Sequence, residues 1–267
     1  MVGIMGMAND STKKTLFVAL ALCLVCSVVV AASAVVLKPL QISNQAFDRK
    51  ANILRAANLY EPGMDVEEVY AERVEARIVD LDTGEYVEDM DPATYDPRQA
   101  ERNPELSERV PPKMDIANIK TRAKYSPVFL IQDGGTLETI VLPVHGYGLW
   151  STLYGFLALE PDTRTVAGLK FYEHAETPGL GGEIDNAEWL EQWRGKVVYD
   201  DEWEPNIRVI KGNVDPENPQ AVYQVDGLAG ATLTSRGVMY LMQYWLSDSG
   251  FGPYLAHLRD QGDTDRG

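Results

Sequence analysis

The sequence predicts an α+β protein in which a single membrane-spanning helix precedes a strand-rich external domain. Three observations support this fold class. Residues 15–37 are apolar and uncharged, several later segments alternate apolar and polar residues as strands do, and the expected strands and helices follow in irregular order. The last observation disfavours a doubly wound parallel sheet, which requires regular alternation of strands and helices.

The N-terminal segment is long enough to be a permanent anchor. Residues 15–37 form a stretch of 23 residues without charge, and about 20 apolar residues cross a bilayer as a helix. Lys13 and Lys14 precede it, so the positive-inside rule places residues 1–14 in the cytoplasm and the bulk of the chain in the periplasm of a bacterium. Ala32-Ser33-Ala34 has the form of a signal peptidase site, but the length of the apolar stretch favours an uncleaved anchor in the inner membrane.

Composition and cysteine usage narrow the function classes. The chain has 24 basic and 40 acidic residues, a net charge of −16, and this excess of acid argues against a nucleic-acid partner, whose phosphates require Lys and Arg. Cys23 and Cys26 are the only cysteines and lie inside the apolar segment, without the further ligands of a zinc or iron–sulfur site. We therefore predict no metal, and we interpret His145 and His174 as structural or surface residues.

Residues 38–115 are predicted to form a stalk helix and an accessory α+β region. A helical pattern begins at Ser43 and ends near Pro62-Gly63. A hairpin is expected around Asp82-Thr83-Gly84, and residues 91–114, rich in proline and charge, are expected to form a long connection.

Residues 116–258 are predicted to form the main domain, and residues 259–267 a flexible tail. Strands are expected at residues 125–132, 136–144, 153–160, 165–174, 196–200 and 220–227. Asp185 and Glu188 match a capping box for a short helix that bears Trp189 and ends at Gly195.

Residues 226–236, Asp-Gly-Leu-Ala-Gly-Ala-Thr-Leu-Thr-Ser-Arg, are the most informative segment of the chain. Apolar residues at helical spacing follow them, which predicts a helix from about Ser235 to Leu246 with Thr234 or Ser235 as its N-cap. A loop of small residues at a helix N-terminus suits a phosphate, because it presents free N–H groups and the positive end of the helix dipole. An ordinary capped loop without a ligand is the alternative. The segment is neither a Walker loop nor a dinucleotide-binding G-x-G-x-x-G loop.

This segment resembles the flavinylation motif in the FMN-binding domains of sodium-translocating NADH:quinone reductases and of the related Rnf complexes. The resemblance implies that a flavin transferase esterifies FMN phosphate to Thr232 and that Asp226, the first residue of the motif, belongs to the FMN site. Ala229 departs from the usual Ser or Thr. The other candidate cofactor-binding residues in this segment are Gly230, Ala231, Leu233 and Thr234.

Two further segments, His145–Phe156 and Glu176–Glu183, resemble the C subunits of the same sodium pumps and occur in the same order. They add further candidate cofactor-binding residues, with Leu180 suited to cover an isoalloxazine face and the aromatic residues suited to stack near it. Taken alone, Pro178-Gly179 in the second segment would indicate only a turn. Aromatic residues in strands usually belong to the core. The candidates are Tyr147, Trp150, Ser151, Glu176, Thr177, Gly179, Leu180 and Gly181.

Together the matches imply a subunit with covalent FMN that carries electrons between other redox subunits of a sodium-exporting NADH:ubiquinone reductase. Because the chain has no dinucleotide fingerprint, the isolated subunit is not expected to oxidise NADH. Two alternatives remain at this point: the G subunit of the Rnf complex, and a periplasmic binding or scaffold protein without redox activity.

Overall fold

The computed structural model describes residues 12–264, and the chain divides into two compact units, Met1–Asp48 and Arg49–Gly267. Helix α1 (Thr12–Ala56) begins in the first unit and ends in the second. An 18-residue window of it has a mean hydropathy of 2.8, so the helix is long and apolar enough to cross a membrane, a test that a signal sequence also passes. The expected helix over residues 15–37 is confirmed, whereas the separate stalk helix is wrong, because α1 continues through Pro39 without a break. Residues 1–11 of the predicted cytoplasmic segment lie outside the described residues.

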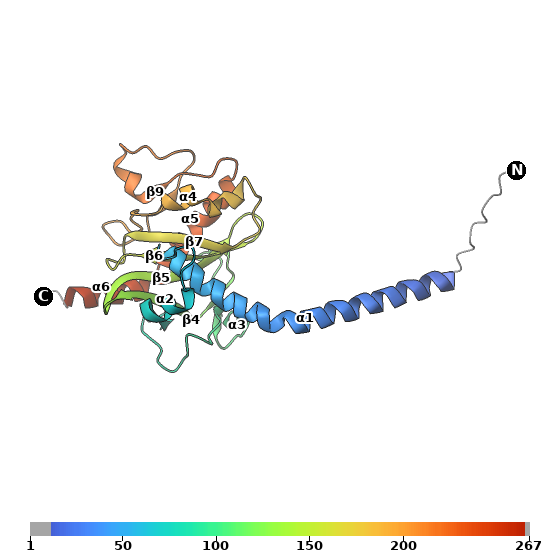
Figure 1. Ribbon diagram of the computed structural model, residues 1–267. Helices are drawn as coiled ribbons and strands as arrows, with labels where there is room; N and C mark the ends of the chain where they lie inside the picture. The colour runs from blue at the N-terminus through green and yellow to red at the C-terminus, as the bar shows by residue number, and fades with distance from the viewer. Residues whose placement is uncertain (1–11, 265–267) are drawn as a thin grey trace. The chain divides into compact units, whose positions relative to one another are not determined.

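The second unit is built on an antiparallel five-stranded sheet in the order β1-β4-β5-β6-β7. Figure 1 labels β4 to β7 of this sheet. Its strands are β1 (Val74–Asp80), β4 (Tyr125–Asp133), β5 (Thr136–Tyr147), β6 (Thr152–Leu159) and β7 (Val166–Glu173). The last four follow one another as a meander and confirm four of the predicted strands. Strand β1 comes from the predicted accessory region and pairs with β4, so that region shares one sheet with the predicted main domain.

The two faces of the sheet carry two different parts of the core. Because side chains alternate along a strand, Leu142 and Val144 of β5 lie on one face and Val141 on the other. Helix α5 (Thr232–Leu246) covers the first face, where its Leu241 joins the largest apolar cluster. On the second face the end of α1 packs through Ile53. The sheet is therefore held between α5 and the last turns of α1, and α5 is the helix that follows the flavinylation-like motif.

Short elements complete the second unit. They are α2 (Val66–Arg73), α3 (Pro97–Ala100), β2 (Ser107–Arg109), β3 (Thr121–Ala123), the 3-10 helix η1 (Gly181–Asp185), α4 (Ala187–Glu191), β8 (Arg208–Val209), the 3-10 helix η2 (Pro219–Tyr223), β9 (Gln224–Val225) and α6 (Gly252–Thr264). Helix α6 continues to Thr264, beyond the start of the predicted tail.

Several expected elements differ from the structure. The predicted hairpin is reduced to an isolated bridge between Val79 and Tyr86, and the predicted connection at residues 91–114 contains α3 and β2. Residues 196–200 form only isolated bridges. Of the strand predicted at residues 220–227, only β9 forms, in parallel pairing with β8. The preceding residues form η2, because Asn218 accepts a hydrogen bond from the backbone N–H of Gln220 and Pro219 is suited to a first helical turn.

The cap of the short helix α4 also differs from the prediction. Asn186, rather than Asp185, accepts the hydrogen bond from the backbone N–H of Glu188. The Asp185 carboxylate instead binds His174, with 2.7 Å between Oδ2 and Nε2. A tertiary partner thus removes Asp185 from the local capping role that its spacing predicted.

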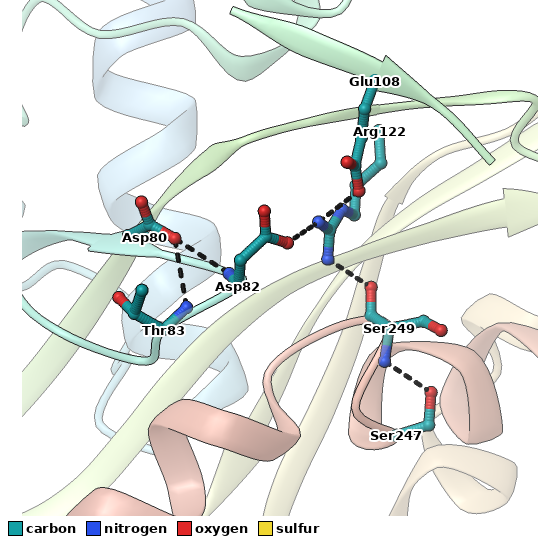
Figure 2. A network of polar contacts seen from close by, with 7 residues as sticks. All are labelled: Asp80, Asp82, Thr83, Glu108, Arg122, Ser247 and Ser249. Atoms are coloured by element: carbon teal, nitrogen blue, oxygen red, sulfur yellow. Dashed lines mark hydrogen bonds and ion pairs between the residues drawn. The ribbon is translucent and has the colours of Figure 1, made fainter.

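Arg122 of β3 connects three segments that are far apart in the sequence (Figure 2). Its buried guanidinium pairs with Asp82 in the turn after β1 and with Glu108 in β2, and donates a hydrogen bond to the carbonyl oxygen of Ser249 at 2.7 Å. Asp80 shapes the same turn by accepting the N–H of Asp82 at 2.9 Å. These contacts tie the predicted accessory region to the connection between α5 and α6.

Replacing Arg122 should destabilise the second unit. We expect Arg122→Met to lower the free energy of unfolding by about 2 kcal/mol, because hydrogen bonds to a charged group are lost while its carboxylate partners reach solvent. Chemical denaturation would measure the change, with exposed Arg109→Met on the neighbouring strand as the matched control. Equal stability of the two variants would contradict a structural role for the Arg122 contacts.

Candidate functional site

Thr232 is the first residue of helix α5, and its side chain is exposed. The helix therefore begins three positions earlier than the predicted Ser235, and its N-cap is Ala231, whose methyl side chain cannot accept a hydrogen bond. The predicted capping role of Thr234 or Ser235 is wrong. The first turn of α5 consequently presents N–H groups that no capping side chain satisfies, beside the Thr232 hydroxyl.

The hydroxyls expected to cap the helix make tertiary contacts instead. Ser235 Oγ accepts the backbone N–H of Leu228 at 3.0 Å, which folds the preceding loop back onto the helix. Thr234 is fully buried and donates from Oγ1 to Oε2 of Glu176 at 2.7 Å. Of the two threonines in the motif, only Thr232 has an accessible hydroxyl.

Two glycines allow the loop before α5 to approach its neighbours. A Cβ on Gly227 would lie 2.1 Å from the carbonyl oxygen of Ile210, so a side chain there would displace backbone. Gly230 has a φ of +73°, a conformation that favours glycine, and a Cβ there would lie 3.0 Å from Cδ2 of Leu180. The motif loop thus lies between the segment at Ile210 and the loop that carries Leu180.

Glu176 joins the three predicted segments of the site. Its Oε1 accepts the backbone N–H groups of Leu149, Trp150 and Ser151 at 3.0, 2.9 and 3.3 Å, and its Oε2 accepts the Thr234 hydroxyl. The residue is only 5% exposed. One carboxylate therefore fixes the turn between β5 and β6 and the first turn of α5 around its own loop.

The hydrogen bonds keep Glu176 ionised. Burial by itself would raise the pKa of the Glu176 carboxyl, but the N–H of Trp150, the Thr234 hydroxyl and the N–H groups of Leu149 and Ser151 together hold this pKa below its ordinary value. The site thus contains a buried negative charge at neutral pH.

The loop after Glu176 is held by its own backbone. The carbonyl oxygen of Thr177 accepts the N–H groups of Leu180 and Gly182, and Gly179 supplies the positive φ of the turn. A Cβ on Gly181 would lie 2.5 Å from Thr234 Oγ1, so Gly181 lies directly against the first turn of α5. The structure therefore brings this loop to the helix terminus.

Large apolar side chains surround these contacts and remain exposed. Trp150 is 65% exposed although Trp is highly buried on average, and Leu233 is 52% exposed. Tyr147, Leu149 and Leu180 are also exposed. Ser151, next to Trp150 in the chain, accepts the N–H of Ala175 on its Oγ at 2.7 Å. The exposed side chains offer apolar surface to a planar ring.

Asp226 does not join the Glu176 cluster. Its Oδ1 accepts the backbone N–H of Val214 at 2.7 Å, and its carbonyl oxygen accepts the indole N–H of Trp189 at 2.8 Å. The side chain thus shapes the loop at Val214, on the other side of the motif.

A hollow of about 410 Å³ lies beside Thr232. Its lining includes Val209–Asn213 and Met239, which the sequence does not predict as site residues, along with the motif loop. Lys211 and Arg236 provide positive charge among these lining residues. The sequence Lys211-Gly212-Asn213 indicates a turn. Its position in the sequence does not indicate that this turn lies near Thr232.

The hollow and its surroundings fit FMN. The first turn of α5 and the two cations suit a phosphate next to the Thr232 hydroxyl, while Ile210, Leu228 and Met239 give the hollow apolar walls. A metal site has less support, since the residues from Thr12 to Thr264 include no group of three or more His, Cys, Asp or Glu that could hold an ion.

The histidines take structural positions. His174 is anchored by Asp185 and accepts the N–H of Glu176 on its Nδ1 at 3.2 Å. His145 lies in a different cluster, with its Nε2 3.3 Å from Glu101. Burial, together with the positive charge of Arg98, lowers the pKa of His145 to about 4, and burial raises the pKa of Glu101 to about 7.

Comparisons with known proteins place these features in one family. A model of the FMN-binding domain family matches residues 148–247. The C subunit of the Na(+)-translocating NADH-quinone reductase of Pseudomonas aeruginosa is 52% identical over 95% of this chain and 98% of its own length, and the same subunit of Vibrio alginolyticus is 44% identical over 94% and 97%.

Two crystal structures support the same assignment of the fold. That of Shewanella oneidensis NqrC matches with a TM-score of 0.76 and 37% identity, over 82% of this chain and 99% of its own. That of the corresponding C subunit from Parabacteroides distasonis matches with a TM-score of 0.62 and 28% identity, over 82% and 96%.

The hydrogen bonds of Glu176 predict a specific dependence of stability on pH. Since the folded state lowers this pKa, it contributes stability that is present above the ordinary pKa of 4.5 and is lost as pH falls through the lower folded value. We expect Glu176→Gln to be about 2 kcal/mol less stable than the parent at pH 7, with a gap that narrows below pH 4.5. Denaturant titrations across this range would measure the gap, and a constant difference would contradict the prediction.

Proposed function

This chain belongs to the family of C subunits of Na(+)-translocating NADH-quinone reductases, and on that basis we propose that it carries electrons through FMN within such a complex. The observation that carries the proposal is the match of the FMN-binding domain to residues 148–247, which contain the exposed Thr232, the Glu176 contacts and most of the hollow. Relatives that are C subunits of the sodium pump align over nearly their whole length, and this favours the sodium pump over the Rnf complex.

We further propose that FMN is joined to Thr232 through a phosphoester. This choice is supported by the accessible Thr232 hydroxyl, the uncapped first turn and the nearby cations Lys211 and Arg236. The Thr234 hydroxyl is buried and hydrogen-bonded to Glu176, so it is not available to accept the phosphate. The bond would form when the Thr232 oxygen attacks the flavin phosphate of an activated donor such as a flavin dinucleotide. The P–O bond to the nucleoside monophosphate would break and the Thr232 proton would be lost. We propose a flavin transferase as the partner that catalyses this step in maturation.

The residues around Thr232 would hold the cofactor without acting as acids or bases. FMN, when bound, supplies transfer of single electrons or pairs. The first turn of α5 would orient the phosphate, and the walls of the hollow with Leu180 and Trp150 would exclude water from the ring. The supporting loops of this site carry predicted cofactor-binding residues, among them Glu176, Thr177, Gly179 and Gly181.

The chain is a subunit of a membrane complex and has one helix apolar enough to span a membrane. We place residues after the span in the periplasm, because Lys13 and Lys14 flank its N-terminal end. A covalent bond would retain FMN on that side, where a dissociated cofactor is not readily replaced.

The Thr232 assignment makes a direct prediction about flavin attachment. Thr232→Leu, produced together with a flavin transferase, should be folded and inserted but carry no covalent FMN, because the acceptor hydroxyl is missing. In-gel flavin fluorescence and peptide mass mapping would measure attachment. Thr234→Ser is the matched control, since it keeps a hydroxyl next to Glu176 and should retain the flavin.

Two outcomes would overturn this assignment. FMN mass found on the peptide at Thr234 would move the attachment site, and full fluorescence in Thr232→Leu would exclude Thr232. A parent protein without any flavin would instead refute the proposed electron-carrier function and favour a binding or scaffold role.

The proposed topology can be tested by labelling with a membrane-impermeant maleimide in spheroplasts. In a background with Cys23→Ser and Cys26→Ser, Lys113→Cys should react directly, whereas Thr12→Cys should react only after permeabilisation. The opposite pattern would reverse the orientation, and a mature N-terminus at Val35 would replace the anchor with a cleaved signal peptide.

A further inference from the structure

We infer that Glu176 is the positioning residue of the flavin site, acting through the backbone of residues 149–151 and through Thr234, and that its charge makes the bound flavin harder to reduce. The inference rests on the proposed function, because it concerns the same site. It differs from the prediction that Glu176 itself binds the cofactor.

The contacts of the carboxylate show why it acts through other residues. Both oxygens already accept hydrogen bonds from the protein, three from the turn at Leu149, Trp150 and Ser151 and one from Thr234. Glu176 is also 5% exposed, so its polar atoms are turned inward. A ligand would meet the segments that Glu176 holds rather than the carboxylate.

These segments carry or adjoin predicted cofactor-binding residues. Trp150 presents its exposed side chain from the turn, and Thr234 lies in the same helical turn as Thr232. A Cβ on Gly148 would lie 2.6 Å from Glu176 Oε1, and one on Gly181 would lie 2.8 Å from Oε2. The backbones at Gly148 and Gly181 therefore pack against the two carboxylate oxygens, which fixes the position of the carboxylate relative to α5.

The charge has a consequence for reduction. An electron delivered by a donor subunit adds negative charge to the flavin, and a fixed carboxylate in a poorly hydrated setting opposes that addition. Solvent screens an exposed carboxylate much more effectively. Removal of the Glu176 charge should therefore shift the midpoint potential in the positive direction, whereas loss of an exposed charge should not.

The test uses the full-length protein in detergent, flavinylated by co-produced transferase. Glu176→Gln has nearly the same shape but no charge, and exposed Glu188→Gln makes the same charge change at the surface. Midpoint potentials come from spectroelectrochemical titration. Amide hydrogen exchange at residues 149–151 is measured in parallel on protein produced without the transferase, which separates positioning from any effect of the flavin.

We expect a more positive midpoint potential and faster exchange at residues 149–151 in Glu176→Gln, with Glu188→Gln matching the parent. A midpoint potential in Glu176→Gln equal to that of the parent would overturn the effect of charge, and unchanged exchange would overturn the positioning role. These results are distinct from failure of the proposed function, in which the parent itself would lack covalent FMN.

A second pair of variants keeps the inference testable if Glu176→Gln does not fold. Thr234→Val removes the hydroxyl that binds Oε2, while Thr234→Ser restores it. Exchange at residues 149–151 should be faster in the valine variant and close to the parent in the serine variant. Equal exchange in both variants would show that Glu176 does not couple α5 to the turn.

Discussion

The buried carboxylate of Glu176 is the interaction on which the candidate site depends. Its four hydrogen bonds gather a strand turn, a glycine-rich loop and a helix terminus that are widely separated in the sequence. Burying a charge is costly unless every lone pair finds a donor, and here backbone N–H groups and a hydroxyl supply the donors. Without the carboxylate, three backbone N–H groups would lose their acceptor, so the turn that bears Trp150 could not keep its shape.

The sequence predicts much of the sheet and the chemistry of the motif because both are local signals. Alternating apolar residues identify β4 to β7, and the order Gly230-Ala231-Thr232 points to Thr232 as the proposed acceptor. The start of α5 was misplaced for a physical reason. Capping rules assume that a hydroxyl near a helix start binds the N–H groups of the first turn. The hydroxyls of Thr234 and Ser235 instead form hydrogen bonds with Glu176 and Leu228.

Long-range contacts account for the other differences. Strand β1 joins the main sheet by pairing with β4, which no periodicity within β1 could indicate. The segment from Val209 to Asn213 lines the hollow only because Gly227 lets two backbones approach closely. Arg122 likewise depends on acids from two other segments. In each case the partner, rather than the residue itself, determines the role.

The position of Thr232 at the first residue of α5 has a consequence for the speed of electron transfer. The same helix buries Val238, Leu241 and Met242 in the main core, so its amino end is attached to a closely packed part of the molecule. A cofactor tethered there would gain and lose charge among groups that are already oriented and scarcely move. The protein groups of such an environment would contribute little to the reorganisation energy, which would lower the barrier to each proposed electron transfer.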